Sequence, residues 1–278
     1  MVNQDLTNVG SHFAFGENWA SYAQIVSEDQ IEKATAALHK LLGGGRLQGK
    51  RFLDIGCGSG IHTLAALRLG ASKVVAVDLD SKSIAATRSL LARYVLEARC
   101  CVEQLSVFDL SPDTLGRFDV VYSWGVLHHT GHMDLALPKA AAMVGEEGEF
   151  LFALYRRTWL CPFWRAEKKW YSQATPRKQR IAQRVYVRWF EFVCKRFFDV
   201  EKYVREYGDV RGMDFCHDVH DWLGGYPYES ILPDEVDSLM GKLGLRHKLS
   251  FLCRAKRTKM HGLLGSGCDE YAYVRTSS

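Results

Sequence analysis

Apolar residues along the chain follow two alternating spacings, and this alternation predicts a sheet covered by helices. Five short apolar runs have the character of buried strands and lie at 51–55, 73–77, 101–105, 118–122 and 149–154. Helical spacing occupies the intervening segments at 61–69, 83–96 and 135–144. Strands that alternate with helices predict right-handed crossovers and a mostly parallel sheet with helices on both faces.

The pattern changes on both sides of this alternating region. The first 25 residues are polar with scattered aromatic residues and predict an irregular arm. A helix is expected from Ser27 to the three glycines at 43–45, which end it. Residues 156–207 predict helices that carry both apolar and cationic positions, and residues 208–230 predict a loop.

The remaining residues are expected to complete the sheet. A helix is predicted at 234–243, and the last two strands are predicted at 246–253 and 270–274. The expected fold class is therefore α/β, with a doubly wound, mostly parallel, seven-stranded sheet and a helical insertion before the last helix.

The composition is that of a folded protein. The chain has 278 residues, of which 47% are hydrophobic and 24% are charged, and this excludes long disorder, collagen-like repeats and coiled-coil rods. No apolar run approaches the roughly 18 residues needed to cross a bilayer, so no transmembrane segment is expected. Eight cysteines, together with a start that lacks the features of a secretory signal, lead us to expect free thiols and a cytoplasmic location.

The net charge of +4 is unevenly distributed. Residues 156–211 carry fifteen Lys and Arg and six Asp and Glu, a net of +9, so the rest of the chain carries −5. One interpretation is a solvated helical face whose long side chains cover apolar surface. A second is the capture of a phosphorylated or acidic substrate, or of a membrane surface. Nucleic acid is the least expected partner, because no RNA-binding module is visible.

The strongest local signal for chemistry is the segment FLDIGCGSG at 52–60, which ends a predicted strand and precedes a helix. Gly56, Gly58 and Gly60 allow the backbone to turn sharply and to approach a ligand closely. At a strand end, such a turn lies in the crevice where open α/β sheets bind nucleotides. The spacing is not that of a dinucleotide site, and Asp54 precedes the first glycine by two residues. An acid there would repel a pyrophosphate but suits a cationic ammonium group.

A second acid, Asp78, ends the next predicted strand eighteen residues after Gly60. Its carboxylate is placed to accept hydrogen bonds from the two hydroxyls of a ribose. A ligand with an ammonium group, a ribose and no phosphate is S-adenosylmethionine, which we expect as the cofactor.

These residues resemble the motifs of the class I S-adenosylmethionine-dependent methyltransferases, over roughly residues 50–155. DIGCGSG at 54–60 resembles their first motif, and FDVVYSWGVLHH at 118–129 is similar to the fourth-strand motif of the small-molecule branch, which includes ubiquinone-pathway methyltransferases. The resemblance implies a Rossmann-like methyltransferase fold, with Asp54 at the methionine end, Asp78 at the ribose and Val107 at the adenine. The expected cofactor-binding residues are Asp54, Gly56, Gly58, Gly60, Asp78, Leu79, Ser106, Val107 and Ser123.

Three histidines are candidate general bases. His128 and His129 follow the fourth strand, at the sheet edge where the methyl group is expected, and His217 lies in the predicted loop. A neutral imidazole near pH 7 can orient an acceptor or remove its proton. For His128 and His129 the alternative is a residue at a helix start that bonds to backbone. The histidines and cysteine of 128–132 and 216–220 lack the familiar zinc spacings, so no metal is expected.

The methyl acceptor is expected to contact acidic and aromatic side chains. Three acidic or imidazole groups within residues 217–221 are costly to bury merely for packing, and carboxylates there suit an amine or polyhydroxyl acceptor. Trp19, Tyr22 and Trp124 are expected to cover the cofactor or the acceptor, with core packing as the alternative. The expected acceptor-binding residues are Tyr22, Trp124, Asp218, Asp221, Trp222 and Tyr226.

The expected activity is therefore transfer of a methyl group from S-adenosylmethionine to an O, N or C atom of a small metabolite. Two alternatives stay open: a methyltransferase that acts on RNA or protein through the basic segment, and a non-catalytic protein that binds the cofactor. The expected domains are 1–49, an arm and helix covering the site; 50–155, the cofactor-binding core; 156–230, the basic aromatic insertion and acceptor loop; and 231–278, the final helix and strands.

Overall fold

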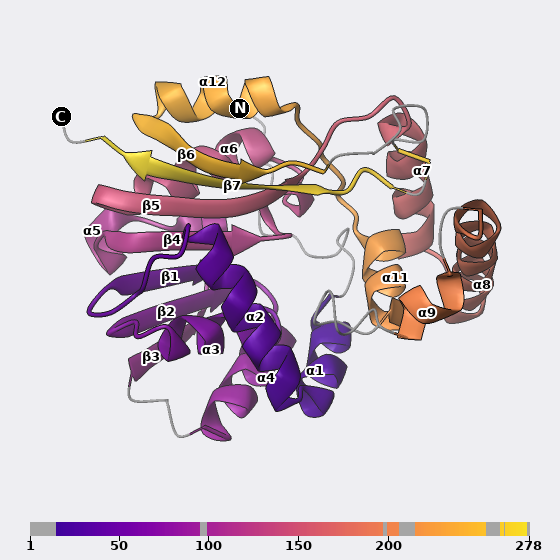
Figure 1. The fold of residues 1–278 in the computed structure, drawn as a ribbon, viewed down its shortest axis with the longest axis horizontal. Helices are drawn as coiled ribbons and strands as arrows, with labels where there is room; N and C mark the ends of the chain where they lie inside the picture. Colours follow the sequence, from indigo (N-terminus) through magenta and orange to yellow (C-terminus); the bar gives the residue numbers. More distant parts are fainter. Residues whose placement is uncertain are drawn as a thin grey trace.

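A seven-stranded sheet runs through the centre of the molecule (Figure 1). The computed structural model describes residues 15–94, 99–196, 199–205, 215–253, 262–263 and 265–276. The strands are β1 (Arg51–Ile55), β2 (Lys73–Asp78), β3 (Cys100–Gln104), β4 (Phe118–Trp124), β5 (Val144–Tyr155), β6 (Leu245–Phe251) and β7 (Cys268–Arg275). Their order is β3-β2-β1-β4-β5-β7-β6, and β7 is antiparallel to both neighbours while the other pairs are parallel. The predicted fold class is confirmed.

Alternating side chains along each strand explain why helices cover both faces of the sheet. On β1, Phe52 packs into a core shared with α2 (Glu28–Leu41), α3 (Ile61–Arg68) and α4 (Ser81–Ala92). Its neighbour Leu53 packs on the opposite face. The helices of that second core are α6 (Met133–Ala142) and α12 (Pro233–Lys242). The short helices between strands are η3 (Val107–Asp109), α5 (Pro112–Leu115) and η4 (Leu127–His129).

The strand order creates the position of the site. From β1 the sheet continues to β2 and β3 on one side and to β4 and β5 on the other. The connections that leave the carboxyl ends of β1 and β4 therefore diverge. Open α/β sheets bind their ligands in the crevice that such a divergence leaves.

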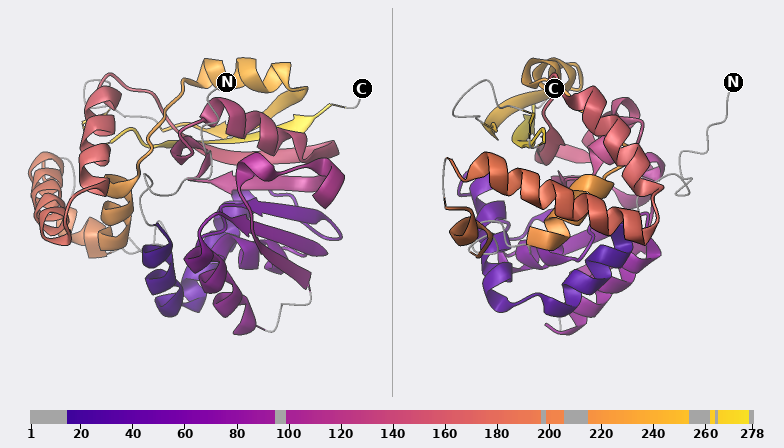
Figure 2. Two further views of the ribbon diagram at one scale, coloured as in Figure 1. Left: turned by 180° about the vertical axis from the view of Figure 1, so that it is seen from behind. Right: turned by 90° about the vertical axis from the view of Figure 1, so that its right-hand side faces the viewer.

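A helical insertion between β5 and α12 stands beside this carboxyl edge of the sheet (Figure 1 and Figure 2). Its helices are α7 (Cys161–Ser172), α8 (Pro176–Cys194), α9 (Val200–Arg205) and α11 (Phe215–Gly224). Helix α11 lies nearest the sheet and contacts α7, α8 and α1 (Phe15–Ile25), whereas α8 forms the outer edge of the molecule. The insertion thus places α11 over the crevice and turns α8 toward solvent.

Two segments differ from the sequence-based expectation. The arm predicted to be irregular contains helix α1, which packs against α4, and its residues 1–14 lie outside the described part of the chain. The segment predicted as a loop at 208–230 contains α11, although 206–214 are likewise not described. Phe215, Val219 and Leu223 recur every four residues in α11 and are all buried, because they form the small core that joins α11 to α7 and α8.

Candidate functional site

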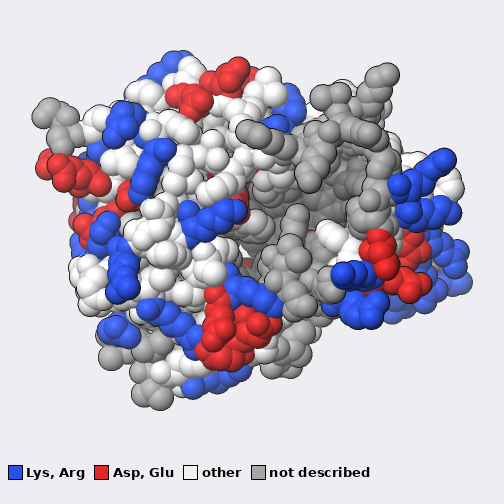
Figure 3. All heavy atoms as spheres, in the orientation of Figure 1, with Lys and Arg blue, Asp and Glu red and all other residues white. Residues whose placement is uncertain are grey.

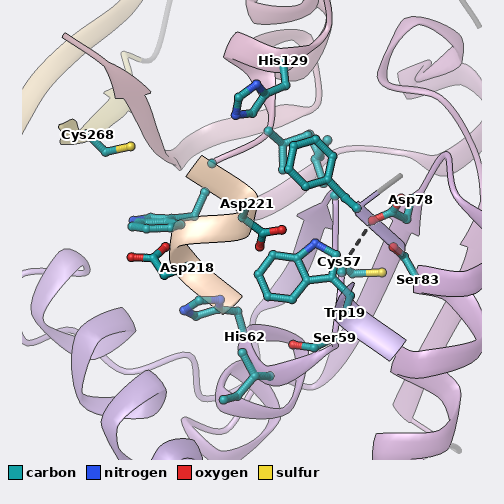
Figure 4. Close-up of a pocket in the computed structure, with 18 of the residues that line it drawn as sticks. Trp19, Cys57, Ser59, His62, Asp78, Ser83, His129, Asp218, Asp221 and Cys268 are labelled. Carbon is teal, nitrogen blue, oxygen red and sulfur yellow. Dashed lines mark hydrogen bonds between the residues drawn. The ribbon is translucent and has the colours of Figure 1, made fainter. Parts of the chain in front are cut away.

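A cavity of about 1000 Å³ opens at the carboxyl edge of the sheet (Figure 4). Its floor comes from the turn after β1 and from the ends of β2 and β4, and α1 and α11 cover it. Strands β5 and β7 close the far end. A cavity of this size can hold a nucleoside-sized ligand and a second small molecule together.

The glycine turn after β1 forms the wall nearest the sheet. The amide groups of Gly56 and Cys57 both donate to the Val77 carbonyl, over 2.8 and 3.1 Å, and this fixes the turn against β2. Gly56 has φ +77°, and a Cβ there would lie 2.3 Å from the Val126 side chain. Gly58 has φ +53°, and a Cβ there would lie 3.4 Å from the Trp19 ring. The turn therefore exposes the bare backbone of Gly56 and Gly58 to the cavity.

Asp78 is held at the end of β2 by the backbone around it. One carboxylate oxygen accepts from the Gly58 amide over 3.0 Å, and the other accepts from the Asp80 amide over 2.9 Å. Burial raises the pKa of Asp78 to about 6, against the lowering effect of these hydrogen bonds. Asp78 lines the cavity together with the predicted residues Leu79, Ser106 and Val107.

Three predicted cofactor residues lie behind the turn, outside the lining of the cavity, and their contact with a cofactor stays a prediction. Asp54 is buried and points toward α3, where its carboxylate accepts from the Thr63 hydroxyl over 2.5 Å. A Cβ on Gly60 would lie 2.9 Å from Thr87 in α4, because this glycine allows two helices to approach. The Ser123 hydroxyl donates to the Ile55 carbonyl and joins β4 to β1. These three residues pack the turn and β1 against α3, α4 and β4.

Buried Asp54 makes the stability of the fold depend on pH. Burial raises the pKa of Asp54 to about 7, well above its value in an unfolded chain. The native state therefore binds a proton that the unfolded state has released, and stability falls as pH rises from the unfolded pKa toward 7. We expect Asp54→Asn, which keeps an oxygen for Thr63, to melt above the parent at about pH 8, by about 2–4 °C for each kcal/mol of relieved desolvation. The two proteins should converge at about pH 4, near the pKa of an unfolded aspartate, in thermal melts of the ligand-free chain.

The difference between the parent and Asp54→Asn reports on Asp54 alone. Asp78 titrates in both proteins, so its contribution to the pH dependence of stability cancels. A parent as stable as Asp54→Asn at the higher pH would show that the buried carboxylate ionises without cost.

The structure separates the two neighbouring histidines. His129 lines the cavity, and its Nδ1 lies 2.7 Å from the Pro227 carbonyl. Since a carbonyl can only accept, Nδ1 carries the hydrogen and the neutral ring has its lone pair on Nε2. His128 does not line the cavity; it is fully buried, with its ring 3.9 Å from that of Tyr155, and burial sets its pKa well below the usual value. His128 is thus packed against Tyr155 outside the lining of the cavity, and its role as a base stays a prediction.

The far end of the cavity is acidic and aromatic. Asp218, Asp221 and Trp222 project into it from one face of α11, because residues three and four apart share a helix face (Figure 4). Tyr22 and Trp124 also line it, and the Trp124 indole donates to Glu270 over 2.9 Å. Tyr226 follows the end of α11 outside the lining of the cavity, and its contact with an acceptor stays a prediction. The side chain of His217 lies outside the described part of the chain.

Several residues of the site were not predicted. Cys57, Ser59 and His62 face the cavity from the turn and from the start of α3. Burial lowers the pKa of His62 to about 4, so this ring is neutral. Cys268 reaches the far end from β7. The available signal was the position of Cys57, Ser59 and His62 in or just after the glycine motif, and of Cys268 at the start of a strand.

A buried lysine supports the far wall. Lys168 on α7 is fully buried, its ammonium donates to the Trp222 carbonyl, and Nζ lies 3.4 Å from the centroid of the Trp222 ring. Burial lowers its pKa to about 7. The hydrogen bond and the cation–π contact together fix the Trp222 ring that faces the cavity.

Helix α1 is held by a hydrogen bond over the end of the cavity that Asp78 lines. The Gly16 amide donates to the Asp80 carboxylate over 3.1 Å, and the other oxygen of Asp80 accepts from Lys82 at the start of α4. Trp19 on the same helix lies against the glycine turn. The Asp80 side chain thus caps the N-terminus of α4 and also holds α1, the helix that covers the cavity.

The residues present fit S-adenosylmethionine. Asp78 offers a fixed carboxylate for ribose hydroxyls, Leu79 and Val107 offer apolar surface for a base, and the bare turn leaves room that a Cβ would fill. The lining gives no cluster of cations for a pyrophosphate among its described residues, since Lys33 and Lys40 are its cations and both come from α2. The donor set therefore suits a nucleoside without phosphate.

The part of the chain that the structure describes has neither a membrane-spanning helix nor a metal cluster. Within these residues, no helix is both long and apolar enough to cross a bilayer. The same part of the chain shows no group of three His, Cys, Asp or Glu side chains placed to hold a metal ion. The seven described cysteines are free thiols.

Comparisons with known proteins agree with this geometry. The family described as "Methyltransferase domain" matches residues 26–193. The ribosomal protein L11 methyltransferase of Xanthomonas oryzae pv. oryzae (strain MAFF 311018) is 49% identical over 65 residues, which span 23% of this chain and only 21% of that relative. The chain thus aligns with about a fifth of that relative's length.

Solved structures show the same fold at low identity. The magnesium protoporphyrin IX methyltransferase of Synechocystis PCC 6803, crystallised with bound SAH, is 12% identical with a TM-score of 0.53, over 89% of this chain and 84% of that one. PKMT2 of Rickettsia typhi, in complex with AdoHcy, is 16% identical with a TM-score of 0.58, over 87% and 52%. The match to more than half of this chain, the shared fold and the cofactor-shaped cavity lead to one conclusion. The chain belongs to the methyltransferase domain family and has its Rossmann-like fold, with a cavity whose residues fit S-adenosylmethionine.

Proposed function

We propose that the chain methylates a small metabolite held at the far end of the cavity. One observation carries the proposal: the cavity continues without a break from Asp78 to Asp218 and Asp221, under the cover of α1 and α11. A deep cavity that two helices cover suits a small molecule that is buried with the cofactor. Membership of the branch that includes ubiquinone-pathway methyltransferases stays a prediction.

The lining of the far end favours a particular kind of acceptor. Carboxylates on α11 and the ring of Trp222 suit an amine or a polyhydroxyl compound with apolar surface. The Lys and Arg residues of α8 line no part of the cavity. An acidic or phosphorylated acceptor, which the basic segment raised, is therefore less favoured.

The bound cofactor supplies a methyl group already activated on a sulfonium sulfur. The side chains then have to align two molecules and exclude water. Asp78 would accept hydrogen bonds from the ribose hydroxyls, and Leu79 and Val107 would contact the adenine. His129 offers Nε2 to take the proton that the acceptor N or O atom loses as its new bond to carbon forms. His217 as an alternative base stays a prediction.

The division of the chain into regions follows from these roles. We propose that residues 50–155 bind the cofactor, while α1 and the insertion close the site, as their positions over the cavity indicate. The final helix and strands complete the sheet and add Glu270 and Cys268 to the far end. Closure by α1 and α11 would exclude water from the reaction.

The proposal is tested by methyl transfer from S-adenosylmethionine labelled on its methyl group, with the products sorted by size. We expect label in the low-mass fraction of a bacterial extract. We expect Asp218→Asn to lower the yield of that product while leaving S-adenosylhomocysteine affinity unchanged, because the carboxylate lies at the acceptor end. Glu146→Gln, at an exposed site in β5, is the matched control.

The same assay separates the alternatives. Label in protein would favour an activity like that named for the L11 methyltransferases, and label in RNA would favour use of the basic segment. Binding of S-adenosylhomocysteine without any labelled product would favour a non-catalytic role. Each of these results would overturn the proposal of a small acceptor.

A further inference from the structure

The outer face of α8 carries a stripe of exposed apolar side chains. Ile181, Val185, Trp189 and Phe192 are 53%, 62%, 41% and 60% exposed, although residues of this type are usually buried. Their spacing of four, four and three residues places them along one side of the helix. We name these four residues the apolar stripe. The opposite side of α8 is already used, since Tyr186 and Phe190 line the cavity.

Cationic side chains flank the apolar stripe along its whole length. The exposed cations of α8 and the two residues after it are Arg177, Lys178, Arg180, Arg184, Arg188, Lys195 and Arg196. Glu191 is the one acidic residue within 176–196. Figure 3 shows Lys and Arg gathered at the end of the molecule that α8 forms. The surface therefore combines apolar contact with a strong positive charge.

This combination fits a bilayer better than another macromolecule. A second copy packed through the same stripe would bring two rows of cations together, which is unfavourable. Single-stranded RNA binds through bases that stack on aromatic faces, but Ile181 and Val185 have none. Trp189 and Phe192 stack on each other, with ring centroids 6.0 Å apart and an interplanar angle of 25°. Apolar residues bordered by Lys and Arg are typical of helices that lie in a membrane interface.

Other exposed aromatic residues belong to the same insertion. Trp159 is 73% exposed just before α7, and Phe163 and Trp170 on α7 are also exposed. Trp side chains favour the headgroup region of a bilayer, where the ring is half in water. The insertion thus offers several anchors outside the sheet domain.

We propose that α8 docks on the surface of an anionic phospholipid bilayer. The apolar stripe enters the boundary between headgroups and acyl chains, and the flanking cations contact the anionic headgroups. Because the inner face of α8 lines the acceptor end of the cavity, docking would place that end within about one helix diameter, about 10 Å, of the bilayer. The proposal stands on α8 and does not depend on which molecule is methylated.

Flotation with vesicles tests the proposal. The full chain should float with vesicles of phosphatidylcholine and phosphatidylglycerol, and less with phosphatidylcholine alone. Val185→Ser with Phe192→Ser should abolish flotation, because each change removes apolar surface from the boundary region. Leu135→Ser with Leu252→Ser is the matched control, since these leucines are 46% and 38% exposed outside the insertion.

A charge variant tests the electrostatic part. Arg184→Gln with Arg188→Gln should weaken binding to the anionic vesicles by roughly fivefold for each cation removed, and added salt should reduce that difference. Arg46→Gln with Arg246→Gln is the control with exposed arginines elsewhere. Unchanged S-adenosylhomocysteine affinity verifies that every variant is folded.

Three results would overturn the proposal. One is a parent protein that fails to float with anionic vesicles. Another is flotation that the stripe variants and the leucine controls share equally. The third is dimer formation in light scattering, or RNA binding in a filter assay, that the stripe variants alone abolish, which would assign the surface to a second copy or to RNA.

Discussion

Replacing Asp78 with alanine is expected to reduce the affinity for S-adenosylhomocysteine by roughly a hundredfold. The carboxylate would accept hydrogen bonds from two ribose hydroxyls. Loss of a hydrogen bond to a charged group costs about 1.5 kcal/mol or more of binding free energy. Isothermal titration calorimetry of the ligand-free chain measures the change directly. Asp78→Asn should lose less affinity, since it keeps one acceptor oxygen at the same position.

The fold should survive this change, although Asp78 also accepts from the Gly58 and Asp80 amides. Gly58 lies in a turn that is held independently by hydrogen bonds to the Val77 carbonyl, and Asp80 is fixed as the N-cap of α4. A circular dichroism spectrum and a cooperative melt would verify it. A folded Asp78→Ala protein with the affinity of the parent would contradict the assignment of this carboxylate to the cofactor.

Gly56→Ala is expected to destabilise the fold and to weaken cofactor binding together. The residue has φ +77°, which costs an alanine about 1–2 kcal/mol. Its Cβ would also lie 2.3 Å from Val126, and overpacking of this kind costs about 1–3 kcal/mol. The combined cost of about 2–5 kcal/mol should appear in urea unfolding, with a fall in S-adenosylhomocysteine affinity as the turn shifts.

Gly49→Ala separates strain from contact. Gly49 has φ +76°, almost the same value, but a Cβ there would meet nothing within 4 Å. Its substitution should cost about 1–2 kcal/mol and leave the cofactor affinity unchanged. Equal losses of stability in the two variants would show that the close approach to Val126 contributes nothing.

The sheet could be predicted because its signals are local. Each strand from β1 to β5 contains a short apolar run, and a helix follows each of these strands in the chain. The glycine turn and Asp78 could be located for the same reason, since both follow directly from strand ends. Their proximity in the structure, where the Gly58 amide donates to Asp78, follows from the parallel pairing of β1 and β2.

The role of a motif residue was harder to predict than its position. Asp54 is part of the motif, yet side-chain alternation in β1 turns it toward Thr63 and away from the cavity. His128 and His129 are adjacent in sequence, but only the second faces the cavity. Such differences depend on tertiary packing, which spacing along the chain does not encode.

The covers of the site could be predicted only in part. Phe15 and Trp19 are separated by four residues in α1, and the same spacing recurs in α11. These helices are short, and isolated helices of about ten residues are marginal in water, so their patterns were weak. Packing of α1 on α4 and of α11 on α7 stabilises them.

The position of β7 between β5 and β6 has a consequence for how the chain folds. Tyr155 of β5 pairs with Cys268 of β7 at the far end of the cavity. The whole insertion lies between these two residues in the sequence. Contacts between residues so distant in sequence raise the contact order and slow folding. The first five strands can associate through nearer neighbours, and the acceptor end should therefore be the last part to assemble in a refolding experiment. Cleavage of the backbone within the insertion would separate β7 from β5 in the chain. The two strands would then have to meet as parts of different fragments, which should slow refolding further.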